Sequence, residues 1–150
     1  MTKMGLLALS ILGMITVSPA RASSCAPRSA DPVQTIRQLY AAVTKGDTAT
    51  VMGMFTDDFY AFDRGKRMTA ADLGAQVDKI RMLRPALVWT VEDADAHVLC
   101  DTAWVTYENL HVPTNGKGAV KGYLESVVLI WRAGTWKLRF FHSSPAAVAD

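Results

Sequence analysis

The chain has 150 residues, half of them hydrophobic, with 16 basic and 14 acidic side chains. This length suits one domain that buries a core of its own, and no internal repeat or low-complexity tract indicates a repeat architecture. The near balance of charge removes the usual electrostatic case for nucleic-acid binding.

The N-terminus has the three-part pattern of a secretory signal peptide. Lys3 precedes the uncharged run Gly5–Val17, and Ala20 and Ala22 place small residues at the two positions that flank a cut after Ala22. The run is too short to span a bilayer comfortably, so we expect residues 1–22 to be removed and no stable membrane anchor to remain. A flexible tail over 23–30, one domain over 31–145 and a tail over 146–150 are then periplasmic or secreted.

Two helices are predicted at the start of the mature domain. Asp31 and Pro32 form an N-cap and a first turn, and apolar residues recur at helical spacing up to Gly46, which is typical of a left-handed C-cap. Asp47 caps a short second helix, and Phe55–Asp58 is predicted to be a turn.

A short strand and a third helix follow. Phe59–Phe62 is strand-like, and Asp63–Lys66 is predicted to be a turn. Thr69 with Asp72 resembles a capping box, which opens a helix that Pro85 ends.

Beyond this helix the hydrophobic period changes from 3.6 to 2, which indicates strands. Asn115 with Gly116, and Ala133 with Gly134, are turn signals between them. Three helices before an antiparallel meander predict an α+β fold, one curved sheet with the helices over its concave face. The predicted strand segments are Leu87–Val91, Ala96–Leu99, Ala103–Tyr107, Val127–Trp131 and Trp136–Phe140.

Five short motifs in this order resemble the nuclear transport factor 2-like superfamily, in particular its small SnoaL-like, ketosteroid-isomerase-related bacterial domains. They are Gly46-Asp47, Phe55–Asp58, Asp101–Val105, Trp131–Lys137 and His142–Ser144, and the resemblance covers residues 31–145. It implies a cone-shaped α+β fold with a pocket between helices and sheet, and usually a homodimer. It implies no single function, since the superfamily includes isomerases, cyclases, dehydratases and binding modules.

Asp63 is a candidate catalytic residue. Its distance from Gly46-Asp47 equals that of the catalytic base in ketosteroid isomerases, and a carboxylate at the mouth of an apolar pocket could move a proton if burial raised its pKa. The alternative, which we favour, is a turn-forming residue paired with Arg64, Lys66 or Arg67.

The oxyanion donors of ketosteroid isomerases are not found at the corresponding positions. The tyrosine position falls on Leu39, and Tyr40 lies one residue further, about 100° around the helix. The second acid's position falls in Ser126–Val128, which has no carboxyl group, and Glu125 is expected to lie off the pocket face. Steroid isomerisation is therefore not expected, because the oxyanion term is often the largest in catalysis.

His142 is the second candidate catalytic residue. It is in phase with Trp136, Leu138 and Phe140, so we expect it to face the pocket and to form an acid–base pair with Asp63. A structural histidine bonded to the backbone or to Ser144 is equally consistent with the sequence.

Tyr107, Asn109 and His111 share one side of a strand and complete a small polar set in an apolar cup, the usual form of a ligand site. The alternatives are a core position for Tyr107 and solvent-exposed positions for Asn109 and His111. The candidate ligand-binding residues are Tyr107, Asn109, Tyr40, Phe62 and Trp131. The tryptophans are also consistent with core or dimer positions.

The sequence predicts no metal site and no cofactor, because the histidines are scattered and no nucleotide-binding fingerprint is present. Cys25 and Cys100 are consistent either with a disulfide or with one cysteine in the tail and one in the core. The apolar run Val127–Trp131 favours a homodimer packed through the outer face of the sheet. We expect a binding domain for a small, mostly apolar molecule; a cofactor-independent isomerase, lyase or hydrolase is the alternative.

Overall fold

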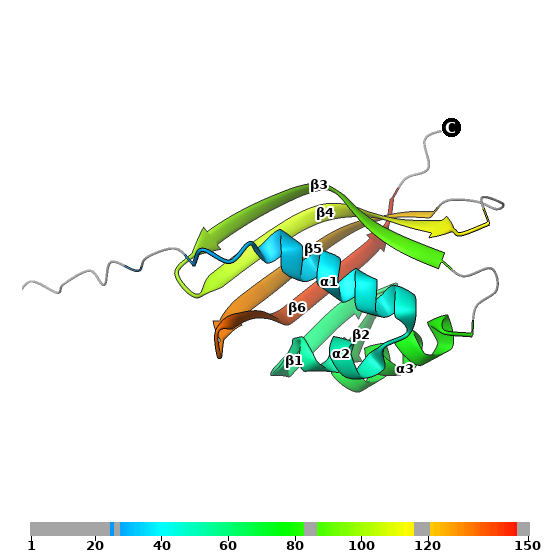
Figure 1. Cartoon of the computed structure of the whole chain (residues 1–150), viewed down its shortest axis with the longest axis horizontal. Coiled ribbons are helices and arrows are strands. Elements are labelled where there is room, and N and C mark those ends of the chain that lie inside the picture. The colour runs from blue at the N-terminus through cyan, green and yellow to red at the C-terminus, as the bar shows by residue number, and fades with distance from the viewer. Residues whose placement is uncertain (1–24, 26–27, 83–86, 116–120, 147–150) are drawn as a thin grey trace, which may run out of the picture.

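The computed structural model describes Cys25 and residues 28–82, 87–115 and 121–146, so the predicted signal peptide and the end of the C-terminal tail lie outside the described residues. One strongly curved sheet forms the body, and α1 lies across its concave face with α2 and α3 beside it (Figure 1). Among the described residues, no helix is long and apolar enough to cross a membrane. The elements are α1 (Pro32–Lys45), α2 (Thr48–Gly53), β1 (Phe55–Asp63), β2 (Lys66–Thr69), α3 (Ala70–Ile80), β3 (Leu87–Leu99), β4 (Thr102–Pro113), β5 (Lys121–Arg132) and β6 (Thr135–Pro145).

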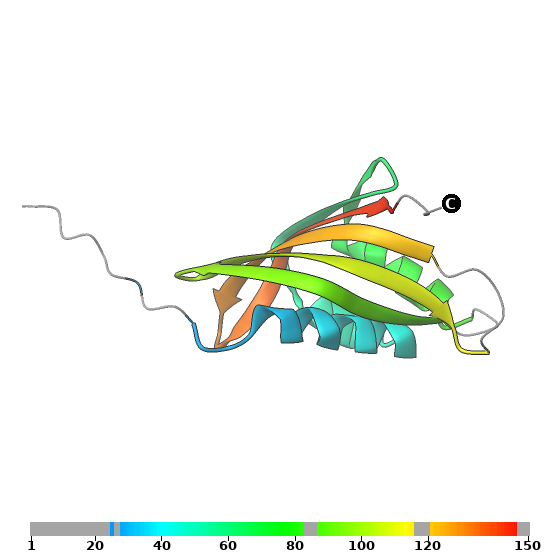
Figure 2. The same ribbon diagram turned by 90° about the horizontal axis from the view of Figure 1, so that it is seen from above.

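The six strands follow the order β2-β1-β6-β5-β4-β3. Neighbouring strands are antiparallel except β1 and β6, which run parallel. Viewed from above, α1 runs alongside the long strand β3 (Figure 2). The predicted α+β class, with a curved sheet and three helices on its concave side, is confirmed.

The N-caps of the helices and the C-cap of α1 are confirmed, whereas α3 ends at Ile80, before the expected end at Pro85. Asp31 Oδ1 accepts a hydrogen bond of 2.8 Å from the Val33 amide, which satisfies one free donor of the first turn. Gly46 ends α1 with φ 65°, and a Cβ built there would lie 2.6 Å from the Arg81 Cβ. That position therefore needs glycine for conformation and for space. Thr69 and Asp72 form the predicted capping box of α3.

Three predictions about the strands were wrong. The segment from Phe55 is the start of β1 and not a turn, and β2 was not predicted at all. β3 is one strand of 13 residues, because a register shift between Glu92 and Asp95 absorbs the polar stretch that separated two predicted strands. Asp93 has φ 46° at this irregularity, which is consistent with a β-bulge.

A second bulge changes which residues of β6 face inward. Val128 pairs with Phe140 and Leu129 pairs with Leu138, so Arg139 is the extra residue with no partner on β5. Leu138 is buried before this bulge, and Phe141 lines the cavity after it. The period of 2 is therefore broken between them, and Phe140 lies on the outer face.

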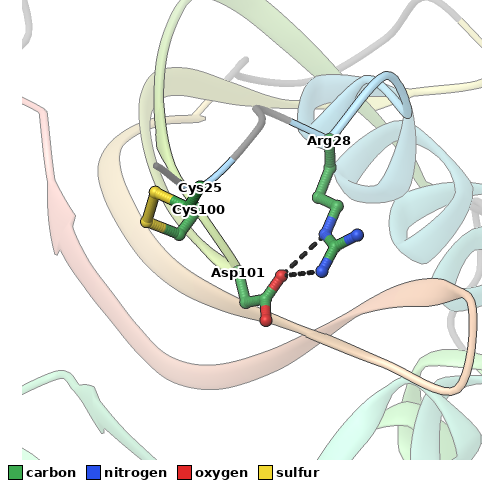
Figure 3. Close-up of a disulfide and its surroundings, with 4 residues drawn as sticks. All are labelled: Cys25, Arg28, Cys100 and Asp101. Carbon is green, nitrogen blue, oxygen red and sulfur yellow. Dashed lines mark hydrogen bonds and ion pairs between the residues drawn. A yellow bond between two sulfur atoms is a disulfide. The ribbon is translucent and has the colours of Figure 1, made fainter. Parts of the chain in front are cut away.

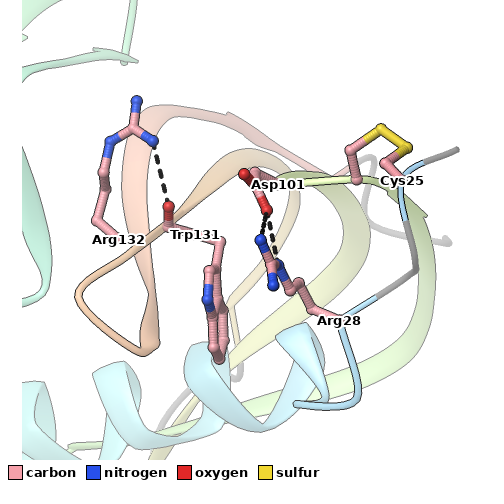
Figure 4. A network of polar contacts seen from close by, with 6 residues as sticks. Cys25, Arg28, Asp101, Trp131 and Arg132 are labelled. Atoms are coloured by element: carbon pink, nitrogen blue, oxygen red, sulfur yellow. Dashed lines mark hydrogen bonds and ion pairs between the residues drawn. A yellow bond between two sulfur atoms is a disulfide. The ribbon is translucent and has the colours of Figure 1, made fainter. Parts of the chain in front are cut away.

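The described part of the N-terminal tail is attached to the end of the sheet. Cys25 forms a disulfide with Cys100, and Arg28 forms an ion pair with Asp101 beside it (Figure 3). The guanidinium carbon of Arg28 also lies 5.7 Å from the centre of the Trp131 ring (Figure 4). These contacts attach the segment immediately before α1 to the end of the sheet, and so they help to position α1 across the sheet.

Candidate functional site

A cavity of about 360 Å³ lies between the three helices and the concave face of the sheet. This is within the range of small-molecule sites, which are usually apolar with a few polar groups. Its apolar wall is formed by Leu39, Val43, Val51, Phe55, Phe59, Leu73, Val77, Ile80, Leu87, Trp89, Leu138 and Phe141.

A row of polar side chains crosses the inner face of four neighbouring strands. Asp63 of β1 pairs with Ser143 of β6, Ser143 pairs with Glu125 of β5, and Glu125 pairs with Tyr107 of β4. Strands are about 4.8 Å apart, so the Cα atoms of Asp63 and Glu125 are separated by roughly 10 Å. Asp63, Ser143 and Glu125 line the cavity itself.

Glu125 is the centre of a buried hydrogen-bond network. Only 6% of the residue is exposed. The Tyr40 hydroxyl, which α1 brings over the sheet, donates a short hydrogen bond to its Oε2, and the Ser143 hydroxyl donates to its Oε1 at 3.0 Å. The Tyr107 hydroxyl lies 3.4 Å from that of Tyr40. Both carboxyl oxygens therefore have a partner, as a buried carboxyl group requires.

Burial raises the pKa of Glu125 to about 7, and the negative charge of Asp63 adds to the rise, while the hydrogen bonds from Tyr40, Tyr107 and Ser143 oppose it. Burial also raises the pKa values of Tyr40 and Tyr107 well above the ordinary value. Near neutral pH, Glu125 is thus divided between its protonated and ionised forms. The protonated form can donate a hydrogen bond into the cavity.

The mouth of the cavity is the end where charged and exposed side chains line it. Arg64 of the β1–β2 turn donates from Nε to Asp63 Oδ2 at 3.3 Å, with its own side chain 63% exposed. Exposed Lys79 of α3 also lines the cavity. Asp63 is only 13% exposed, because it lies behind Arg64.

Three aromatic rings line the cavity, and we call Trp89, His111 and Tyr123 the aromatic collar. The His111 ring centre lies 5.0 Å from that of Trp89 and 4.4 Å from that of Tyr123. Burial and the positive charge of Lys121 lower the pKa of His111 to about 4, although Asp63 opposes this. The imidazole is therefore neutral at pH 7 and contributes to the collar as an uncharged ring.

Asp63 and Tyr40, two of the predicted site residues, line the cavity. Tyr40 was expected to lie about 100° around the helix from the Leu39 position, but both residues line the cavity. The apolar stripe of α1 is wide enough that Leu39 and Tyr40 both face the sheet, one on each side of the stripe's centre. Tyr107 reaches the site through its hydroxyl contact with Tyr40.

His142 does not face the cavity, so the predicted convergence of Asp63 and His142 was wrong. After the bulge at Arg139, Phe141 and Ser143 point inward and His142 points to the outer face. Phe62 is also on the outer face, 42% exposed, where its ring centre lies 5.6 Å from that of Phe140.

Asn109 and Trp131 lie inside the fold but not along the cavity. Asn109 is fully buried, its Nδ2 donates to the Thr90 carbonyl at 3.1 Å, and its Oδ1 has no hydrogen-bond partner among the described residues. The alternative of a solvent-exposed Asn109 was therefore wrong. Trp131 packs edge-to-face on Trp136 at the far end of the sheet.

The expectation that Glu125 lies off the pocket face was wrong, because it lines the cavity. Because Val127 and Leu129 are buried, a strict period of 2 places Glu125 on the same inner face. That signal was present, but the run Val127–Trp131 is hydrophobic on both faces. The sequence therefore does not show which of its residues face inward. Ser143 was missed for a different reason, since the bulge in β6 decides its direction.

The described residues contain no group of three or more His, Cys, Asp and Glu side chains that could hold a metal ion. The side chains that line the cavity offer carboxyl, hydroxyl and imidazole groups. These can donate and accept hydrogen bonds, and the two carboxyl groups can exchange protons with a ligand.

The fold resembles solved structures of several kinds. The CaMKII hub of S. rosetta is 25% identical, with a TM-score of 0.66 over 79% of this chain and 100% of that one. A proposed dehydratase of the nuclear transport factor 2-like family from Streptomyces avermitilis is 19% identical, with a TM-score of 0.67 over 77% of this chain and 94% of that one. A proposed ketosteroid isomerase from Shewanella frigidimarina is 21% identical, with a TM-score of 0.61 over 74% of this chain and 92% of that one.

No curated relative matches the sequence of this chain. The family model of the SnoaL-like domain matches residues 33–148, which is most of the chain and includes every element from α1 to β6. The chain belongs to the SnoaL-like domain family.

Proposed function

We propose that this domain binds one small, mostly apolar molecule whose hydrogen-bond-accepting oxygen meets Glu125. The observation that carries the proposal is the placement of a protonatable carboxyl group, 6% exposed, in a cavity with a largely apolar wall. Burying such a group costs free energy, and a ligand oxygen that accepts its proton offsets part of that cost. The cavity volume of about 360 Å³ lies in the lower part of the range of small-molecule sites.

Two substitutions of similar size test this binding mode. Glu125→Gln keeps an N–H donor in the cavity, whereas Glu125→Met removes every donor at that position. With 2-decanone as the probe, isothermal titration calorimetry should give nearly unchanged affinity for Glu125→Gln. It should give about 5- to 20-fold weaker affinity for Glu125→Met, which corresponds to about 1–2 kcal/mol for a lost hydrogen bond. Equal affinities of the two variants would exclude this hydrogen bond.

A second candidate function is proton transfer next to a carbonyl group, with Asp63 as the base and Glu125 as the hydrogen-bond donor to the carbonyl oxygen. It is favoured by one specific observation: the cavity holds two carboxyl groups in different surroundings, one beside Arg64 and one in the buried network. In this reaction the carbon next to the carbonyl gives its proton to Asp63, and Glu125 stabilises the enolate oxygen.

Deuterium exchange tests this candidate without knowledge of the substrate. In D₂O, the protein should speed the exchange of the α-protons of 2-decanone, as followed by proton NMR. Asp63→Asn should abolish the acceleration but keep most of the binding, because it removes the charge and preserves the shape. Asp58→Asn is the matched control, since Asp58 pairs with Arg139 and does not line the cavity. Exchange no faster than in buffer would leave binding alone as the function.

We also propose that the protein is exported and is periplasmic or secreted. The Cys25–Cys100 disulfide supports this proposal, because structural disulfides persist in oxidising compartments. The mature protein should begin at Ser23, two residues before the disulfide, and intact-mass measurement of the native protein checks this. A mass that includes residues 1–22 would contradict it.

A further inference from the structure

The cavity mouth carries more positive than negative charge among the described residues. Arg64 and Lys79 line the cavity there, and Lys121 is close enough to lower the pKa of His111. Asp63 is the only acid among the described cavity-lining residues at the mouth, and Arg64 pairs with it. The local excess is notable because the mature chain carries equal numbers of acidic and basic residues.

Lys79 is the residue that most needs an explanation. A basic residue in the last turn of a helix often offsets the helix dipole, and Lys79 occupies that position in α3. Its side chain also lines the cavity, however, and it makes no hydrogen bond or ion pair with any described residue. The neighbouring acid, Asp78, accepts a hydrogen bond from Thr48 instead.

The remaining mouth residues leave room for an anion. Arg64 uses its Nε for Asp63, and the other guanidinium nitrogens are free to meet a second acceptor. The cavity lining also includes the aromatic collar, in which His111 is neutral at pH 7 because burial lowers its pKa to about 4. A ligand that fills the cavity therefore meets the cations Arg64 and Lys79, a largely apolar wall and the Glu125 carboxyl group.

We propose that the ligand is an amphiphilic anion, with a carboxylate or similar acidic group held at the mouth by Lys79 and Arg64 and a carbonyl or hydroxyl oxygen held at Glu125. This inference rests on the proposed binding function and names the ligand class. The cavity volume of about 360 Å³ suits a small molecule. A chain of about ten carbons with an acid at one end and a ketone near the other is such a molecule.

The test compares 9-oxodecanoate with 9-oxodecanamide, which has the same shape but no charge. In calorimetric titrations at about 20 mM salt, the carboxylate should bind about 5- to 20-fold more tightly than the amide. At about 500 mM salt the ratio should approach one, because the mouth is exposed and its charges are screened. Lys79→Gln should reduce the ratio about two- to fivefold, mainly by weakening carboxylate binding.

Arg132→Gln is the matched control, since Arg132 is an exposed cation at the opposite end of β5 from Lys121. It should leave the ratio unchanged. Equal binding of acid and amide, or a ratio that Lys79→Gln does not alter, would overturn the anionic ligand and leave the proposed binding function standing. Failure of both probes to bind would overturn both.

Discussion

Replacing Glu125 by Gln should change how the stability of the protein depends on pH. The pKa of Glu125 rises from its ordinary value of 4.5 in the unfolded chain to about 7 in the folded protein. The folded state therefore holds this proton more tightly. The contribution of Glu125 to stability is fully present below pH 4.5 and is lost as the pH rises through about 7.

The size of this effect follows from the change in pKa. A rise from 4.5 to about 7 corresponds to about 3 kcal/mol at 1.36 kcal/mol for each pH unit. Glutamine does not ionise, so this contribution disappears from the variant. The free energy of unfolding of Glu125→Gln relative to wild type should increase by about 3 kcal/mol between pH 4 and pH 8. This difference does not depend on what the substitution itself costs at any one pH.

His111 has the opposite effect over nearly the same pH range. Its pKa falls from 6.5 to about 4 on folding, so its contribution to stability is present above pH 6.5 and is lost as the pH falls towards 4. Partial exposure of the ring reduces the magnitude. In the wild-type protein His111 therefore offsets part of the pH dependence that Glu125 causes. In Glu125→Gln only the contribution of His111 remains of these two. The free energy of unfolding of this variant should therefore rise with pH between about 4 and 6.5.

Urea unfolding at several pH values between 4 and 8, with the disulfide intact, measures these differences. His111→Asn should give the mirror image, with stability falling as the pH rises. Glu92→Gln is the control, because Glu92 is exposed on β3 and should leave the wild-type profile unchanged. A Glu125→Gln profile parallel to that of the wild type would show that Glu125 does not titrate as its buried position implies.

Two further predictions concern the disulfide and the outer face of the sheet. Cys100→Ser should lower the free energy of unfolding by about 4 kcal/mol on the chain-entropy model, because the disulfide closes a loop with a sequence separation of 75. Urea unfolding of the wild type and the variant measures this difference. A loss below about 1 kcal/mol would contradict the prediction. We also predict a homodimer through the outer face, where Phe62, Trp104 and Leu124 are 42%, 44% and 56% exposed. Light scattering at micromolar concentration should give twice the monomer mass for wild type and the monomer mass for Trp104→Lys, and a monomeric wild type would count against the interface.

Much of the fold was predictable because its signals are local. The caps at Asp31, Gly46 and Thr69 act within one helical turn, and the apolar period of each helix acts within a few turns. The change of the hydrophobic period from 3.6 to 2 after α3 is also a local signal, and it predicted the strands of the sheet. The expected class, α+β with a curved sheet and three helices, follows from these features without knowledge of any distant contact.

The site was less predictable because its residues come from α1 and four strands. Asp63 was identified from its spacing, and Tyr40 from its type and position. Four other residues were proposed for the same pocket but do not line it. Two lie on the outer face, His142 and Phe62, and two lie elsewhere in the interior, Asn109 and Trp131. Residue type and the alternation along one strand do not determine which residues of the neighbouring strands lie beside it.

The amino-acid sequence by itself determined the three helix starts, the left-handed end of α1 and the change from helices to strands. Only the tertiary structure decided which polar groups meet in the cavity. The bulge at Arg139 turns Ser143 inward and His142 outward, and the pairing of β5 with β6 brings Ser143 to Glu125. Tyr40 completes that network from α1, 85 residues away along the chain. Such a register is selected by the packing of the whole sheet against its helices, so no short stretch of sequence contains it.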